Sequence, residues 1–115
     1  MDNKYSSRSV TVDGIRFASR KEARRYRELC LLEAAGQIKH LRCHPRYEII
    51  PAFERNGEKH RAAHYTADFE YTDLVTGEYV AEDVKGGKAT QTAAFNLRAK
   101  LFRLRYPDYV LRITE

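Results

Sequence analysis

A clear alternation of apolar and polar residues between Arg61 and Thr72 constrains this sequence most strongly. Successive side chains of a β-strand point to opposite faces of a sheet, so a period of two predicts one long strand with one buried face. The apolar face comprises Tyr65, Ala67, Phe69 and Tyr71, and the polar face comprises His64, Thr66, Asp68 and Glu70. The chain therefore has to build a sheet that places Asp68 on its polar side.

Two other extended segments flank this strand in the sequence. The first is predicted from Arg46 to Phe53, and the second from Glu78 to Lys85. Asn56-Gly57 and Thr76-Gly77 supply the turns between the three segments. Short connections of this kind favour an antiparallel meander.

The segment before the sheet predicts a hairpin and a helix. Ser9 to Phe17 alternates around the turn residues Asp13-Gly14. Ser19-Arg20-Lys21-Glu22 fits the capping box that starts a helix, which should continue to about Ala35 and end at Gly36.

The segment after the sheet predicts a second helix from Thr92 to Tyr106 and a last strand from Tyr109 to Ile113. The helix carries Ala94, Leu97, Leu101 and Leu104 on one face. We expect an α/β fold in which a mixed central sheet, with its antiparallel meander, is flanked by two helices and preceded by an N-terminal hairpin. The 115 residues fit one domain over residues 9–115, with residues 1–8 as a flexible arm.

The composition narrows the class of partner. The net charge of +5 and the pI of about 9.3 favour a polyanion such as nucleic acid. No apolar run approaches the roughly 20 residues that span a bilayer, and the polar N-terminus lacks the core of a signal peptide. We therefore expect a cytoplasmic protein without a membrane partner, with Cys30 and Cys43 as free thiols. A zinc site from these cysteines, His40 and His44 is a weaker alternative, because the spacing fits no standard zinc pattern.

The chemically informative stretch runs from Val80 to Gly86. Alternation places Asp83 and Lys85 on the same face, and Asp68 lies on the polar face of the preceding strand. If the two strands pair, the two carboxylates approach each other and need a cation between them. Magnesium, with manganese as a substitute, suits two carboxylates plus a backbone carbonyl such as that of Val84.

Two further side chains complete this hypothesis. The ammonium of Lys85 could orient a water molecule or neutralise charge on a phosphate. Glu22 lies at the start of the helix stripe that faces the sheet, so it could reach the site as a metal ligand or catalytic group, or act only as the cap partner of Ser19. Asp83 and Lys85 could equally be a solvated charge pair on an edge strand.

Weaker assignments concern residues that could touch DNA. The candidate phosphate contacts are Arg20, Lys21, Arg24, Arg25, Lys88 and Arg98, and His64 and Thr66 are candidate accessory residues. Each also has an ordinary explanation, either a solvated helix face or a structural sheet residue. Glu82 falls on the opposite strand face from Asp83 and is interpreted as a charge at the surface or behind the site.

The order of these motifs also resembles a known family. The matching stretches are Val12 to Ser19, Lys21 to Tyr26, Tyr65 to Phe69 and Glu82 to Gly86, followed by Leu101-Phe102 and Tyr106-Pro107. Over residues 9–113 the chain is similar to a family of small phage and prophage proteins, formerly of unknown function, within the PD-(D/E)XK nuclease superfamily. Ala67 stands where the superfamily motif often has proline.

This resemblance implies magnesium-dependent cleavage of DNA by a nuclease similar to Holliday-junction resolvases. The superfamily motif then maps onto Glu22, Asp68, Asp83 and Lys85. The expected function is an endonuclease for double-stranded or branched DNA, such as recombination intermediates, in the cytoplasm of a bacterium or phage-infected host. A homodimer is left open. The alternatives are a non-catalytic nucleic-acid-binding module on the same fold and a protein-interaction domain.

Overall fold

The structure is a computed structural model that describes residues 8–86 and 91–115. Its elements are β1 (Val10–Val12), β2 (Ile15–Phe17), α1 (Arg20–Ala34), β3 (Ile38–Cys43), β4 (Arg46–Ile50), β5 (Phe53–Arg55), β6 (Glu58–His60), β7 (Ala63–Thr66), β8 (Phe69–Asp73), β9 (Tyr79–Val84), α2 (Ala93–Arg105) and β10 (Tyr109–Thr114). The predicted N-terminal arm lies outside the described residues except for Arg8. No helix in the described ranges is long and apolar enough to cross a membrane.

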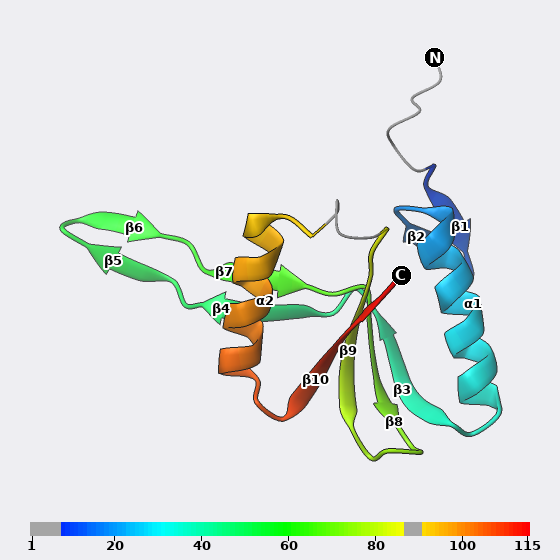
Figure 1. Ribbon diagram of the computed structural model, residues 1–115. Coiled ribbons are helices and arrows are strands. Elements are labelled where there is room, and N and C mark those ends of the chain that lie inside the picture. The colour runs from blue at the N-terminus through cyan, green and yellow to red at the C-terminus, as the bar shows by residue number, and fades with distance from the viewer. Residues whose placement is uncertain (1–7, 87–90) are drawn as a thin grey trace.

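A four-stranded sheet forms the centre of the molecule, with strand order β10-β9-β8-β3. Strand β8 is antiparallel to both neighbours, and β10 returns through α2 to lie parallel to β9 (Figure 1). The expected mixed α/β sheet is therefore present. The two helices, the N-terminal hairpin and the final strand also form where the sequence predicts them.

The three antiparallel strands of the sheet are β3, β8 and β9, and they differ from the three that the sequence predicted. The first is β3, which the sequence analysis did not identify, and it pairs with β8 in place of the Arg46 segment. The single strand expected from Arg61 to Thr72 is divided at Ala67 and Asp68 into β7 and β8, which belong to different sheets. The apolar residues of the alternation are buried as predicted, but not on one face, because Tyr65 belongs to one hydrophobic core and Phe69 and Tyr71 belong to another.

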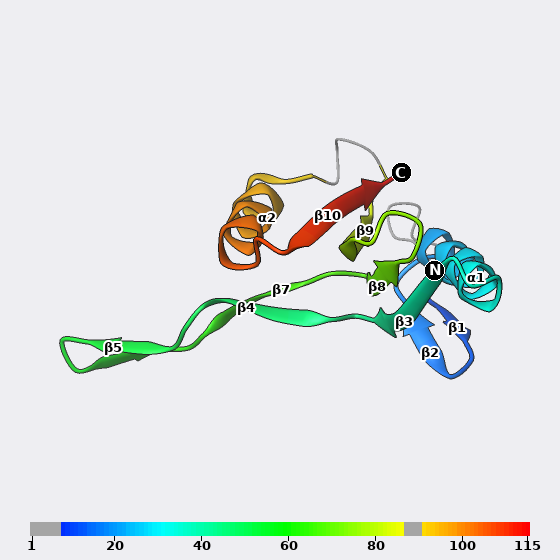
Figure 2. The same ribbon diagram turned by 90° about the horizontal axis from the view of Figure 1, so that it is seen from below.

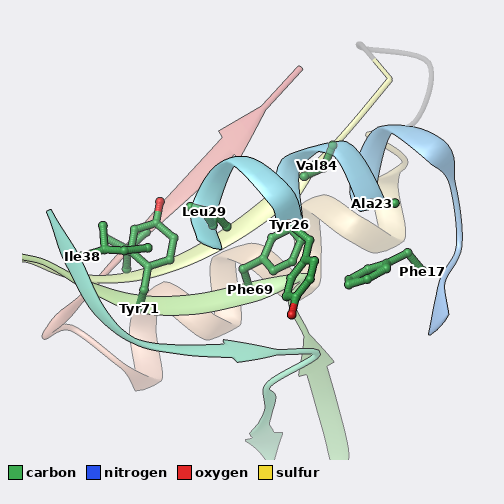
Figure 3. Close-up of a cluster of buried hydrophobic side chains, with 9 residues drawn as sticks. Phe17, Ala23, Tyr26, Leu29, Ile38, Phe69, Tyr71 and Val84 are labelled. Carbon is green, nitrogen blue, oxygen red and sulfur yellow. The ribbon is translucent and has the colours of Figure 1, made fainter. Parts of the chain in front are cut away.

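Two hydrophobic cores lie on opposite faces of β9. The first joins α1 and the β1–β2 hairpin to the sheet, with Phe17, Leu29 and Phe69 fully buried (Figure 3). The second joins α2 to β4 and β7 through Phe102 and its neighbours. Val80 and Val84 of β9 belong to the first core and Ala81 to the second. Because β9 is covered on both faces, its side chains are held rigidly.

Helix α2 buries a different face from the leucine stripe that the sequence suggested. Its buried residues are Phe95, Ala99 and Phe102, whereas Leu97 and Leu104 have 59% and 73% of their surfaces exposed. Phe102 packs against Tyr47 and Tyr65 with ring centroids 4.8 and 5.3 Å apart. The aromatic side chains on β4 and β7 select the aromatic face of the helix, because rings contribute the largest contact area.

Strands β4 to β7 form a long ribbon that leaves the body of the molecule (Figures 1 and 2). At its base β4 pairs with β7, and at its tip β5 pairs with β6 around Asn56-Gly57. Both turn residues have positive φ, at 52° and 78°, as a two-residue hairpin turn of this type requires. The ribbon replaces the simple first strand predicted for Arg46 to Phe53.

Candidate active site

Asp68 and Asp83 come from neighbouring strands at the same end of the sheet. Phe69 is opposite Glu82 in the β8–β9 register, so each aspartate is one residue from this pair. The backbone N–H of Val84 donates to Asp68 Oδ2 at 2.6 Å, and the Tyr65 hydroxyl donates to Asp83 Oδ2. The strand pairing on which the sequence hypothesis depended is therefore present, and both carboxylates are held in place.

Both aspartates resist ionisation in this environment. Burial raises the pKa of Asp68 to about 6, although the Val84 N–H opposes that rise. Burial likewise raises the pKa of Asp83 to about 6, with the positive charge of Lys85 acting in the opposite direction. The charge of Glu22 raises both pKa values further, so Glu22 and Lys85 each act electrostatically on both aspartates.

Lys85 follows the end of β9 and contacts both helices. Its ammonium lies 4.2 Å from the centre of the Phe95 ring in α2. Its backbone N–H donates to the Thr114 carbonyl at 2.8 Å, and its carbonyl accepts from the Lys21 ammonium at 2.9 Å. Contacts from β10, α1 and α2 thus fix this residue beside Asp83.

Glu22 caps its helix in a slightly different way from the predicted box. The Ser19 hydroxyl accepts from the Glu22 N–H at 3.1 Å, as expected. The Glu22 carboxylate accepts from the N–H of Ala18 at 3.2 Å, instead of from Ser19. Glu22 is half-buried, so its cap role and its effect on the aspartates coexist.

The arrangement suits a cation held by few protein ligands. Across the described residues, no group of three or more His, Cys, Asp or Glu side chains is close enough together to hold a metal ion by itself. The described part of the chain therefore forms no zinc cluster from Cys30 and Cys43. Two desolvated carboxylates fit magnesium, which keeps several waters and uses one or two carboxylates.

A hollow of about 430 Å³ opens beside Asp83 and Lys85. Its other lining residues come from β7 and α2 and are His64, Tyr65, Thr66, Thr92, Phe95 and Arg98. The two predicted accessory residues, His64 and Thr66, and the predicted phosphate contact Arg98 therefore share one surface with Asp83. A substrate in this hollow would reach both the carboxylate and the ammonium.

The predicted basic residues on α1 divide into two groups. Lys21 and Arg25 face β9, where Lys21 binds the Lys85 carbonyl and Arg25 binds Glu82. Arg20 and Arg24 are exposed and remain available to a phosphate. Lys88 lies outside the described residues.

The sequence left Glu82 as a charge either at the surface or behind the site. Glu82 is completely buried, so the surface interpretation is wrong. Arg25 holds it with two bonds, Nε to Oε2 at 2.6 Å and Nη2 to Oε1 at 3.0 Å, and the Tyr71 hydroxyl also donates to it. The hydrogen bond to Glu82 raises the pKa of the Arg25 guanidinium. The available signal was the apolar surroundings of Glu82 in the strand, combined with an arginine one helical turn after Glu22.

Residues 2–114 match the family described as "Protein of unknown function (DUF1064)". The chain belongs to this family. No curated protein and no solved structure shows significant similarity to it. The matched residues include Glu22, Asp68, Asp83 and Lys85.

Proposed function

We propose that this protein is a metal-dependent DNA endonuclease of the PD-(D/E)XK type that hydrolyses phosphodiester bonds. The observation that carries the proposal is the pairing of β8 with β9, which places Asp68 and Asp83 at one end of the sheet with Lys85 beside them. With Glu22 included, the site contains three carboxylates and one ammonium. This excess of negative charge favours a bound cation.

Asp68 and Asp83 would hold the metal. The N–H of Val84 points toward Asp68, and the N–H and C=O of a strand residue project to the same side, so the Val84 carbonyl is a candidate third oxygen. A bound magnesium or manganese ion would polarise the phosphate and lower the pKa of a water molecule. Glu22 is a further candidate through water, since its carboxylate already influences both aspartates.

The remaining residues hold and orient groups around that centre. Tyr65 fixes one oxygen of Asp83, which leaves the other oxygen as the ligand. The ammonium of Lys85 lies over Phe95 beside the hollow, where it can neutralise charge that develops on the phosphate. Arg98 on the same hollow and exposed Arg20 and Arg24 on α1 would contact flanking phosphates.

A non-catalytic nucleic-acid-binding module is the rival function. Such a module has no use for two carboxylates beside a phosphate, because like charges repel, by about 1 kcal/mol at 4 Å in water. Both carboxylates are instead held in place by donors on two strands, which favours a role for them.

The test is cleavage of linear, nicked, forked and four-way DNA by the purified protein, with magnesium or with a chelator. We expect magnesium-dependent products, with a preference for branched over linear substrates. Native protein that binds these DNAs with no cleavage in magnesium or manganese would support the binding module instead.

A further inference from the structure

The tip of the long ribbon is exposed on all sides. Residues 50–59 form a run of ten exposed residues that contains β5 and most of β6. These two strands pair only with each other, and the views in Figures 1 and 2 both place them away from the sheet and the helices. Phe53 nevertheless has 49% of its surface exposed and stacks on His60 with ring centroids 4.5 Å apart. An isolated two-stranded hairpin is marginally stable, so a projecting one is better explained by a partner than by folding.

The ribbon is continuous with the candidate active site. Strand β7 runs from the tip to Thr66, and both His64 and Thr66 line the hollow that holds Asp83. Arg46 lies opposite Thr66 in the β4–β7 register, and its guanidinium is 3.2 Å from His64 Nδ1. A partner bound along the ribbon would therefore reach the hollow beside Asp83.

The side chains of the β5–β6 hairpin suit a partner surface that offers both hydrogen-bond donors and hydrogen-bond acceptors. Across the described residues, Arg55, Lys59 and Arg61 form no ion pair, while Glu58 contacts only His60. In the register Glu54 is opposite Lys59 and Arg55 is opposite Glu58, so acidic and basic groups alternate across the hairpin. This balance disfavours binding to phosphates alone, because the carboxylates would be repelled. It fits base edges, which present donors, acceptors and thymine methyl groups together.

We propose that the β5–β6 hairpin enters the major groove of the duplex that flanks the scissile phosphate. A two-stranded ribbon has the width that this groove admits. At about 3.3 Å per residue step, the stretch from Asn56 to Thr66 spans up to roughly 33 Å, which is about one helical turn of B-DNA. The substrate is then DNA with a duplex arm of at least about one turn beside the cut. The position of the cut rests on the proposed function, whereas the groove contact does not.

The test compares two triple variants of matched chemistry. The ribbon variant is Phe53→Ser/Arg55→Ser/Lys59→Ser, and the control is Leu31→Ser/Arg27→Ser/Lys39→Ser, which also removes one exposed apolar residue and two exposed cations from α1 and β3. Binding is measured by fluorescence anisotropy in chelator, on duplexes of about 10 and about 30 base pairs. The shorter duplex spans only about one helical turn in all, whereas the longer one offers a full turn beside the bound site. Because no metal is present, the result does not depend on whether the protein cleaves DNA.

We expect the ribbon variant to lose most of the affinity gained with the longer duplex, about tenfold or more, and the control variant to keep it. Equal losses in both variants would overturn the proposal. So would a native dimer that the ribbon variant converts to a monomer with unchanged DNA binding, because the ribbon would then serve a second copy of the chain. If the ribbon variant does not fold, protection of guanine N7 from dimethyl sulfate by the native protein decides the question, since N7 lies in the major groove. Absence of any protected guanine in bound duplex would overturn the groove contact.

Discussion

The guanidinium of Arg25 donates two hydrogen bonds, of 2.6 and 3.0 Å, to the completely buried carboxylate of Glu82. Arg25 lies on α1 one turn after Glu22, and Glu82 precedes Asp83 on β9. A second bond joins the same two elements, from the Lys21 ammonium to the Lys85 carbonyl. These contacts fix the helix that carries Glu22 against the strand that carries Asp83 and Lys85.

The first prediction separates the positioning role of this ion pair from its role in stability. Arg25→Met should cost about 3–5 kcal/mol of unfolding free energy, because it leaves the Glu82 charge buried without a partner. Adding Glu82→Leu should restore most of that stability, as apolar replacements of buried ion pairs often do. Denaturant unfolding measures both effects. The control is Arg112→Met, which breaks the partly exposed pairs with Asp73 and Glu78 and should cost less, roughly 1 kcal/mol.

DNA cleavage by the stable double variant is the decisive measurement for this prediction. We expect kcat to stay well below that of the native protein, because α1 is no longer held in register with β9. If the double variant recovers both full stability and full cleavage, the Arg25–Glu82 pair contributes to stability alone and does not position the site.

The second prediction concerns the candidate catalytic residues. Asp83→Asn should abolish magnesium-dependent cleavage and keep or tighten DNA binding, because the carboxylate that holds the metal also repels phosphate. Lys85→Ala should stop cleavage while metal affinity is largely retained, since an ammonium is not a ligand. Cleavage assays and magnesium titrations measure the two properties separately. Unchanged cleavage in purified Asp83→Asn protein would contradict the assignment of this residue.

The third prediction distinguishes the two roles of Glu22. Glu22→Gln keeps an oxygen that can accept from the Ala18 N–H but removes the charge that acts on Asp68 and Asp83. Turnover should therefore fall much more than the melting temperature. Ser19→Ala is the matched control, because it removes a cap that is worth about 1 kcal/mol without touching the charge. A lower melting temperature with normal turnover in Glu22→Gln would make Glu22 a cap residue alone.

Local patterns predicted the elements of this fold better than their partners. Alternation identified Tyr65, Phe69 and Tyr71 as buried residues, because side-chain direction depends only on the strand itself. It could not show that the chain changes sheets at Asp68, because pairing depends on segments far away in the sequence. Strand β3 was missed because it carries three polar residues and a bulge, where His40 adopts a φ of 59° and interrupts the period of two.

The residues of the candidate site were also predictable where they depend on local patterns. Asp68, Asp83 and Lys85 follow from alternation and a short turn, which are local features. The buried state of Glu82 depends on Arg25, a residue 57 positions away, and no local pattern reveals such a partner. The face of α2 was ambiguous for a related reason, since apolar residues occupy two sides of the helix and the aromatic surface of β4 and β7 decides between them.

The last prediction is a pH dependence of stability in the metal-free protein. Folding raises the pKa of Asp68 and Asp83 from 3.8 to about 6. The folded state then holds protons more tightly than the unfolded state, so these groups contribute stability that is complete below pH 4 and is lost as the pH rises through about 6. The melting temperature in chelator should therefore fall across this window, by about 4–8 °C for each 1 kcal/mol lost.

The comparison that isolates the two aspartates uses Asp68→Asn/Asp83→Asn protein, in which other titrating groups are unchanged. This variant should lack the fall between pH 4 and 7, and its melting temperature at pH 7 should exceed that of the native protein in chelator. Magnesium should raise the melting temperature of the native protein at pH 7, because binding to the folded state offsets the repulsion between the carboxylates, and it should leave the variant unaffected. Parallel pH profiles for the two proteins, with no response to magnesium in either, would contradict both the raised pKa values and the cation site.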